Sequence, residues 1–334
     1  MKIDIHTHIM PRHLPNWTQK FGYGDFIHLA DHPANCNCAR MMKGDQFFRE
    51  IESNCWDAEV RMNDCATHGV TQQVLSTIPV LFNYWAKTEH AYDTSRFYND
   101  HIAEVCSRHS DKFFGLGTVP LQDPQMAIQE MERCIKVLGL NGIEIGTNVN
   151  QENLGDPKYF EFFKAAEALG AAIFVHPWEM MGEDKYKKYW LPWLVGMPAE
   201  SSRAICSLIF SGTLEKLPNL RIAFAHGGGS FPFTLGRIEH GFDCRPDLVA
   251  VDNPISPRNY LNRIYVDALT HDGPTLDFIV NLFGENNICM GTDYPFPLGE
   301  DVPGALIESR AYEKSVKDKL LYKNALRWLG VENN

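Results

Sequence analysis

Long apolar runs and an excess of basic residues are both missing from this sequence. Its 334 residues contain no uninterrupted apolar stretch of about 18 residues, the length that reads as a transmembrane helix. The formal net charge is −11, whereas a surface that binds nucleic-acid phosphates needs an excess of lysine and arginine. We therefore expect neither a membrane nor a nucleic acid as a partner. A small anionic substrate stays open, because a few well-placed arginines are enough to bind one.

A secretory signal and a disulfide framework are missing as well. Lys2 and Asp4 interrupt the first segment, and no apolar signal core follows them. The nine cysteines are an odd and scattered set, which is typical of reduced thiols, so we expect a cytosolic protein. Cys36 and Cys38 lack the spacing of a zinc knuckle and have no second pair. We interpret them as a loop feature, with metal binding as the less favoured alternative.

Short apolar runs alternate with amphipathic segments, without a linker or repeat. Helical patterns such as Met126–Leu138 and Tyr159–Leu169 indicate crossover helices between parallel strands. This alternation predicts a single (β/α)8 TIM-type barrel over residues 1–334. The runner-up, an open doubly wound sheet, lacks a Gly-x-Gly-x-x-Gly after its first strand. The predicted strands are Ile3–His8, Gln73–Thr77, Phe113–Val119, Gly142–Thr147, Ala171–His176, Arg221–His226, Ile264–Ala268 and Ile288–Asp293.

The first two predicted strands are separated by an unusually long segment. It contains several aromatic residues, four histidines and the two neighbouring cysteines. We interpret residues 12–70 as a small insertion after the first strand, which forms a lid or a hairpin over the barrel mouth.

Histidines and one aspartate mark the ends of four predicted strands. His6 and His8 are two residues apart on a strand, so their side chains lie on the same side. The carboxyl ends of barrel strands converge on one site, where three imidazoles and a carboxylate suit a borderline divalent ion. The residues predicted to bind one Zn²⁺ per chain are His6, His8, His176 and Asp293.

His226 is the imidazole left outside this set, and its role is open between three interpretations. The first interpretation is a further metal ligand, and the second is a base that is not bound to the metal. The third is a neighbour of an anion-binding loop formed by Gly227–Gly229. We favour the base, because four groups already satisfy one ion and the glycines leave space for a substrate. A water on zinc has its pKa lowered to about 7, and a neighbouring imidazole can take its proton.

A bridging lysine is absent from the fourth predicted strand, Gly142–Thr147. A carbamylated lysine that joins two metal ions is therefore not available there. Glu144 is a substitute in principle, but the residues around it follow the ordinary alternation of a barrel strand. We expect one ion.

Several motifs together resemble the metal-dependent amidohydrolase superfamily, and more closely its decarboxylase branch. They are His-Thr-His at 6–8, Val-His-Pro-Trp at 175–178, His-Gly-Gly-Gly at 226–229 and Gly-Thr-Asp-Tyr-Pro-Phe-Pro at 291–297. Longer matches cover Asn-Cys-Trp-Asp at 54–57 and the segment 188–200. The resemblance runs from end to end and is weakest at about residues 25–45.

The resemblance implies a single-zinc barrel that removes carbon dioxide without hydrolysis. It puts the metal ligands at the four residues named above and the acid/base histidine at His226. The implied substrate is an open-chain amino dicarboxylate semialdehyde from the kynurenine route of tryptophan breakdown. Removal of its carboxylate would divert this compound from quinolinate formation. The resemblance also implies a homodimer in which an arginine crosses into the partner's site.

Arginines and aromatic residues complete the predicted pocket. By resemblance, Arg49 binds substrate and Arg237 is the crossing arginine; Arg245 is a nearby third possibility for which a surface salt bridge is favoured. Trp190, Phe296 and Trp193 would wall a planar conjugated substrate, although core packing is nearly as good an account of Trp193. Asp4 and Glu200 are candidates for carboxylates that orient the histidine ligands.

Other function classes stay open. A hydrolase of the same superfamily would cleave a lactone or amide and release no carbon dioxide. A second alternative is decarboxylation of an aromatic acid such as a hydroxybenzoate. A metal-stabilised barrel that serves only as a binding module is disfavoured, because the predicted site is open.

Overall fold

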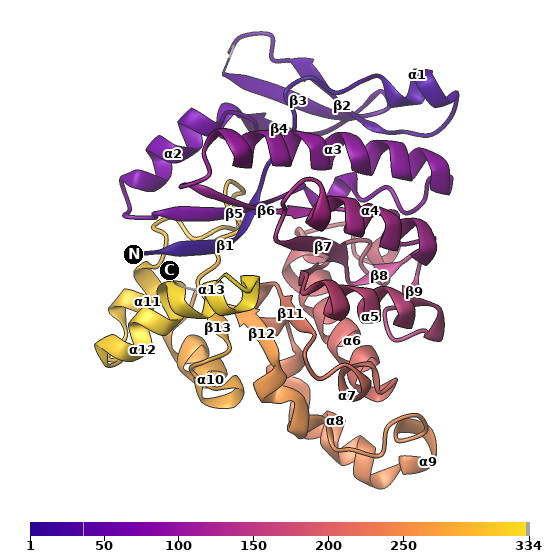
Figure 1. Cartoon of the computed structure of the whole chain (residues 1–334), viewed down its shortest axis with the longest axis vertical. Helices are drawn as coiled ribbons and strands as arrows, with labels where there is room; N and C mark the ends of the chain where they lie inside the picture. The colour runs from indigo at the N-terminus through magenta and orange to yellow at the C-terminus, as the bar shows by residue number, and fades with distance from the viewer. Residues whose placement is uncertain (36, 332–334) are drawn as a thin grey trace.

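Parallel strands form a barrel in the computed structural model, which describes residues 1–35 and 37–331. In those residues the main sheet has eight strands, which follow one another in chain order (Figure 1). Ile5 donates its backbone N–H to Met290 O at 3.0 Å, and Thr7 pairs in parallel with Tyr294, which joins the first strand to the last. The predicted barrel is confirmed. Its strands are β1 (Ile3–His8), β5 (Gln72–Ser76), β6 (Phe113–Gly117), β7 (Gly142–Gly146), β10 (Ala172–His176), β11 (Arg221–Phe224), β12 (Ile264–Asp267) and β13 (Ile288–Cys289).

The strands are buried on both faces, which explains their near-continuous apolar runs. In β10, Ile173 and Val175 belong to the large core shared with the surrounding helices. Phe174 belongs to a separate inner cluster that includes Trp328 of α13 (Asn324–Leu329). His176 has the same parity as Phe174, so the alternation of the strand turns it toward the barrel interior.

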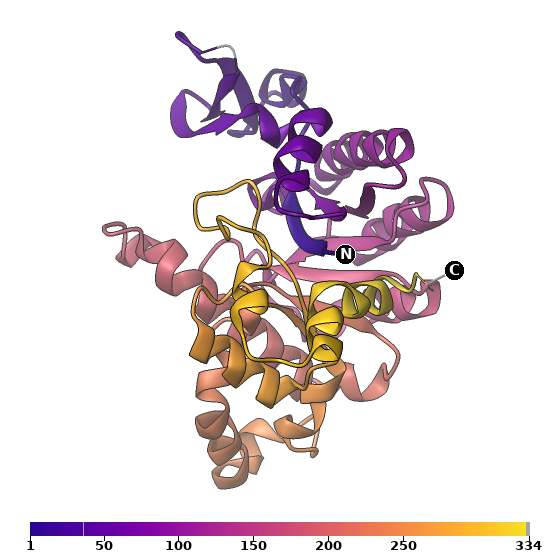
Figure 2. The ribbon, with the colours of Figure 1, turned by 90° about the vertical axis from the view of Figure 1, so that its left-hand side faces the viewer.

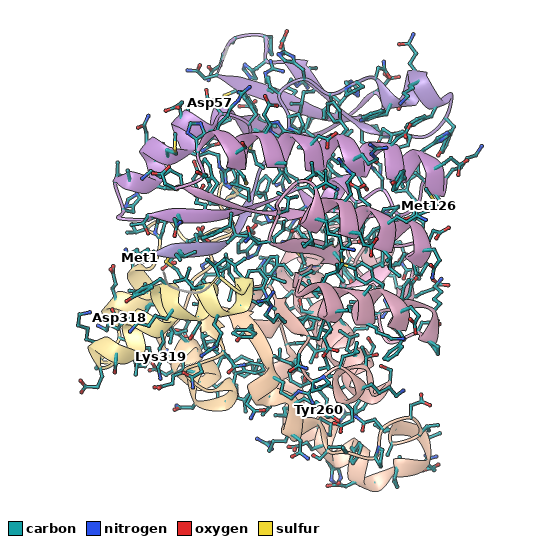
Figure 3. The ribbon with its side chains drawn as sticks, in the orientation of Figure 1. Met1, Asp57, Met126, Tyr260, Asp318 and Lys319 are labelled. Carbon is teal, nitrogen blue, oxygen red and sulfur yellow. The ribbon has the colours of Figure 1, made fainter. Side chains whose placement is uncertain are left out.

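Helices connect the strands and cover the barrel. Figure 3 labels Asp57, which precedes α2 (Ala58–Ala66) and accepts the backbone N–H groups of Glu59 and Val60 with its carboxylate. Asp123 caps α4 (Pro124–Lys136) in the same way, so this helix begins two residues before the predicted Met126. The connecting helices are α2 (Ala58–Ala66), α3 (Thr88–Arg108), α4 (Pro124–Lys136), α5 (Phe160–Leu169), α6 (Met197–Phe210), α7 (Thr213–Lys216), α8 (Phe231–Cys244), α9 (Pro246–Val249) and α10 (Gly273–Phe283), followed by α11 (Ala305–Ser309) and α12 (Lys314–Asp318).

The long segment after β1 holds a small antiparallel sheet. Its strands are β2 (Ile27–Asp31), β3 (Cys38–Lys43) and β4 (Gln46–Glu52), preceded by the short helix α1 (Trp17–Phe21). Figure 2 shows this sheet at one end of the molecule, beside α3. Met41 and Ile51 of the sheet pack in one cluster with Tyr98 of α3. A lid function for residues 12–70 stays a prediction.

Six of the eight strands end one to four residues earlier than predicted, and in two of them the difference involves a predicted site residue. β11 stops at Phe224 and not at His226, and β13 stops at Cys289 and not at Asp293. His226 has a φ of 57° and Asp293 a φ of 60°, both in the left-handed region and far from the extended backbone of a strand. The backbone therefore turns out of the sheet before it reaches either residue. Along the described part of the chain, no helix combines the length and apolarity needed to cross a membrane.

Candidate metal centre and substrate pocket

Three imidazoles and one carboxylate meet at the carboxyl ends of β1, β10 and β13. One candidate ligand atom from each residue lies within 4.8 Å of all the others. Oδ1 of Asp293 is 3.1 Å from Nε2 of His8 and 3.4 Å from Nε2 of His6. The ring centroid of His176 lies 5.1 Å from the ring centroids of both His6 and His8. The structure thus brings together the four residues that the sequence analysis predicted as ligands.

Hydrogen bonds orient all three rings in the same sense. Nδ1 of His8 lies 2.8 Å from Thr77 O, and Nδ1 of His176 lies 3.0 Å from Pro177 O. Because a carbonyl oxygen only accepts, Nδ1 carries the proton in both rings and Nε2 presents a lone pair. Nδ1 of His6 lies 2.7 Å from a carboxylate oxygen of Asp267. The Nε2 atoms of His6, His8 and His176 are buried, without a hydrogen-bond partner among the described residues.

The charges of these groups also suit a cation. Burial lowers the pKa of His8 and, more strongly, that of His176, so both imidazoles are neutral. Burial lowers the pKa of His6, but the carboxylates of Asp293 and Asp267 outweigh it and raise that pKa. Burial alone would raise the pKa of Asp293, but the charge of His6 and the hydrogen-bonding rings of His226 and His8 hold that pKa well below its ordinary value. Two neutral imidazoles with inward lone pairs, the similarly turned ring of His6 and an ionised carboxylate fit one divalent ion.

Glu144 of β7 lies close to this cluster without joining it. Its Oε1 is 3.6 Å from Nδ1 of His8, which already faces the Thr77 carbonyl. Burial raises the pKa of Glu144 well above its ordinary value, and the charge of Asp293 adds to the effect. Among the described residues, the cluster of candidate ligands does not include Glu144, so this position gives no support for a second ion.

His226 stands beside the cluster at the mouth of the site. Its Nε2 is 3.8 Å from Oδ2 of Asp293, and 18% of its side chain is exposed. Of the glycines that follow it, Gly227 and Gly229 line the cavity, and Gly229 also packs closely. A Cβ atom on Gly229 would lie 2.4 Å from Pro198 O and 2.8 Å from Cβ of Ser201.

A cavity of about 290 Å³ lies above these residues. Its wall is mostly aromatic and aliphatic, which is typical of a small-molecule site. Arg49 of β4 reaches it with its guanidinium 4.8 Å from the ring centroid of Phe296. No carboxylate of the described residues is within ion-pair distance of Arg49, so its charge is free for an anionic ligand. The predicted site residues that line the cavity are His8, Arg49, His176, Trp190, Trp193, His226, Asp293 and Phe296.

Two predicted arginines lie outside this cavity. Arg237 is exposed on α8 and does not line the cavity of its own chain. Arg245 forms an ion pair with Asp247, with 2.7 Å between Nη2 and Oδ2. This is the surface salt bridge that the sequence analysis favoured for it.

Neither carboxylate predicted to orient a histidine ring does so. Asp4 accepts the backbone N–H of His6 and the N–H and hydroxyl of Thr292. Glu200 accepts from Asn148 Nδ2 at 3.0 Å and from a backbone N–H at 2.9 Å. The carboxylate that orients a ligand ring is that of Asp267, which contacts Nδ1 of His6 and was missed by the sequence analysis. Its signal was an aspartate that closes the apolar run Ile-Tyr-Val-Asp at 264–267.

The two-cysteine motif is only partly described. Cys38 is buried at the start of β3, and Asn35 donates its side-chain N–H to Sγ at 3.0 Å. Cys36 lies outside the described residues. Cys38 pairs with Glu52 of β4, so its interpretation as part of a loop is wrong.

Comparison with known proteins gives a consistent family. Residues 3–331 match the model of the amidohydrolase family. The 2-amino-3-carboxymuconate-6-semialdehyde decarboxylase of Dictyostelium discoideum is 56% identical over 335 residues, which cover 100% of this chain and 93% of the relative. The enzyme of the same name from Caenorhabditis elegans is 35% identical, over 100% of this chain and 95% of the relative.

Solved structures share the fold. IDCase from Metarhizium anisopliae, in its apo form, matches with a TM-score of 0.85 and 23% identity, over 100% of this chain and 98% of that chain. A dihydroxybenzoic acid decarboxylase from Polaromonas sp. JS666, with bound manganese and the inhibitor 2-nitroresorcinol, matches with a TM-score of 0.78 and 22% identity over the same shares. These structures show the fold alone, whereas the family model and the two relatives show the family. This chain belongs to the amidohydrolase family, in the branch of the 2-amino-3-carboxymuconate-6-semialdehyde decarboxylases.

Proposed function

We propose that this protein removes carbon dioxide from 2-amino-3-carboxymuconate 6-semialdehyde and yields 2-aminomuconate 6-semialdehyde, in tryptophan breakdown by the kynurenine route. One observation carries the proposal. The candidate metal centre, His226 and the unpaired charge of Arg49 all face one cavity. A carboxylate substrate needs such a cation, and the close relatives carry the name of this reaction.

We propose Zn²⁺ as the resident ion, held by the Nε2 atoms of His6, His8 and His176 and by the carboxylate of Asp293. Nitrogen-rich sets with one carboxylate suit this borderline ion. The manganese in the structural neighbour supports a divalent ion in this fold, without identifying the metal used here. When bound, the ion supplies Lewis acidity that polarises an oxygen atom of the substrate or of water.

The residues of the chain supply binding and proton transfer. The planar fork of Arg49 binds a substrate carboxylate, and the aromatic wall holds the conjugated plane of the substrate. When the carbon–carbon bond to the carboxylate breaks, its electron pair stays on the substrate carbon. His226, in its protonated form, donates a proton to that carbon, so a C–H bond replaces the lost carboxylate. The reaction consumes no water.

We further propose a C2 homodimer in which Arg237 enters the partner's cavity. Helix α8 supports this proposal because it exposes an unusual face. Phe233 is 64% exposed and stacks on Phe278 of α10, with 4.8 Å between ring centroids. Gly236 is a mid-helix glycine with open space where its Cβ would be. The exposed ring of Phe233 and the open space at Gly236 allow a second copy to approach closely.

The decisive experiment follows two products of one reaction. Metal-loaded protein is mixed with the semialdehyde, and loss of near-ultraviolet absorbance is recorded together with release of carbon dioxide. Equal amounts of substrate lost and gas released support the proposal. Loss of absorbance without gas indicates a hydrolase. Turnover of a hydroxybenzoate in place of the semialdehyde indicates an aromatic-acid decarboxylase. A cytosolic location stays a prediction.

A further inference from the structure

One buried carboxylate joins the candidate metal centre to the loop that carries His226. Asp267, the last residue of β12, is fully buried. Its Oδ2 accepts the Nδ1–H of His6 at 2.7 Å and the backbone N–H of His226 at 2.9 Å. Its Oδ1 accepts the backbone N–H groups of Gly227 at 2.8 Å and Leu269 at 3.2 Å.

We propose that Asp267 is a positioning residue that couples ion binding at His6 to the conformation of the His226 loop. The inference rests on the proposed function, because it assumes an ion in the cluster. An ionised carboxylate only accepts hydrogen bonds, and here all four partners are N–H donors, two on each oxygen. No neutral side chain of similar size offers four acceptor sites in this arrangement.

The loop needs such an anchor because its backbone is unusual. His226 has a φ of 57°, and the three glycines after it have φ values of 61°, 79° and 63°. Glycine adopts this left-handed region freely, whereas a histidine there is disfavoured and persists only where its surroundings hold it. The N–H groups of His226 and Gly227 both donate to Asp267, which fixes the turn and with it the direction of the His226 side chain.

The other end of the same carboxylate sets the ring of His6. The two remaining imidazoles of the cluster donate to neutral carbonyl groups, and His6 donates to a charge. A carboxylate partner fixes the ring orientation and raises the basicity of the opposite nitrogen, which strengthens it as a ligand. A change in the ring of His6 therefore alters the hydrogen bonds that hold the His226 loop, and a change in the loop alters those that hold the ring.

The unmodified protein offers the first test. Amide hydrogen exchange is compared between metal-free and metal-loaded samples, in peptides that contain residues 225–229. We expect the amides of His226 and Gly227 to gain more protection on ion binding than those of α4, which report general stabilisation by the ligand. Equal gains in the two segments would overturn the coupling.

A matched pair of variants offers the second test. In Asp267→Asn, whichever way the amide is turned, an NH₂ group replaces one acceptor oxygen and faces two N–H donors. We expect a metal affinity about 10- to 100-fold weaker in a chelator competition, and a lower kcat with a KM close to wild type. The control is Glu130→Gln in α4, a fully buried carboxylate that pairs with Arg133 and lies in a different element. It should lower the melting temperature and leave metal affinity unchanged.

The outcomes separate this inference from the proposed function. If Asp267→Asn binds metal as tightly as wild type while the protein remains a decarboxylase, only the coupling is wrong. If wild type binds no divalent ion, both the proposed function and the coupling are wrong. If Asp267→Asn does not fold, the exchange experiment on wild type decides alone.

Discussion

Oδ1 of Asp293 lies 3.1 Å from Nε2 of His8, although one residue follows the last strand of the barrel and the other ends the first. A neutral imidazole has one N–H group, and in His8 this group is Nδ1–H, which faces the carbonyl oxygen of Thr77. Nε2 therefore has no proton to donate to Asp293. Two lone-pair-bearing atoms thus face each other in a buried place, which is unfavourable unless a cation lies between them. This contact is the clearest physical argument for an ion in the cluster.

Metal removal is the first prediction. Carefully prepared protein should contain one equivalent of a divalent ion, and a chelator should abolish turnover and lower the melting temperature, since buried Nε2 atoms lose their partner. Adding back the ion should restore both. The measurement is elemental analysis with a thermal melt. Two equivalents of metal per chain, or a melt that does not change on chelation, would contradict a single-ion site.

Replacing His226 tests its separation from the metal. His226→Asn should keep one equivalent of ion, because the four candidate ligands are untouched, and should reduce kcat about 10²- to 10⁴-fold as proton transfer is lost. His109→Asn, remote in the chain and outside the cavity, is the matched control and should retain activity. A His226→Asn protein that purifies without metal would make His226 a ligand, and one with normal turnover would remove it from the mechanism.

Arg49→Lys tests the binding of a substrate carboxylate. Lysine keeps the charge and loses the planar fork, so we expect a loss of about 2–3 kcal/mol, or roughly 30- to 150-fold, in kcat/KM. The control is Arg40→Lys, which lies on β3 of the same small sheet and does not line the cavity. Equal kinetics for the two variants would show that Arg49 does not contact the substrate.

The sequence was most informative where the chemistry follows from local periodicity. His6, His8 and His176 were predictable because a strand's alternation fixes the side of each residue, and barrel topology brings the strand ends together. The ends of β11 and β13 were not, because the left-handed turns at His226 and Asp293 depend on tertiary contacts. Asp267 was missed for the same reason. A carboxylate after an apolar run has many ordinary uses, and its contacts with β1 and the His226 loop exist only in the folded barrel.

The small sheet was the least predictable part. β4 is largely exposed, so its residues lack the apolar alternation that marks the barrel strands. The approach of Arg49 to Phe296 joins residues from opposite ends of the chain. Residue types alone assign Arg49 no partner, and its candidacy came from family resemblance.

A partly buried histidine that does not line the cavity predicts a pH effect on stability. Burial lowers the pKa of His101 in α3 from 6.5 to about 4, and its Nε2 has no hydrogen-bond partner in the described residues. Above pH 6.5 the ring is neutral in both states. As the pH falls from about 6.5 to 4, only the unfolded chain binds the proton, so the free energy of unfolding falls by about 2–3 kcal/mol. His101→Gln should make this acid slope shallower in urea unfolding at several pH values. An identical slope would show that His101 does not titrate in this way.

The shared site makes the last prediction, which concerns two variants that are each inactive. If Arg237 completes the partner's cavity, a C2 dimer makes the exchange reciprocal. In a mixed dimer of Arg237→Ala and His226→Ala, both damaged residues fall in one site, and the other site has His226 and Arg237 intact. Random exchange of equal amounts makes half of the dimers mixed, each with one good site, so activity should return to about a quarter of wild type. Subunit exchange is verified separately, for example by native mass spectrometry of differently tagged chains. If subunits exchange and no activity returns, Arg237 serves its own chain and the shared-site proposal is wrong.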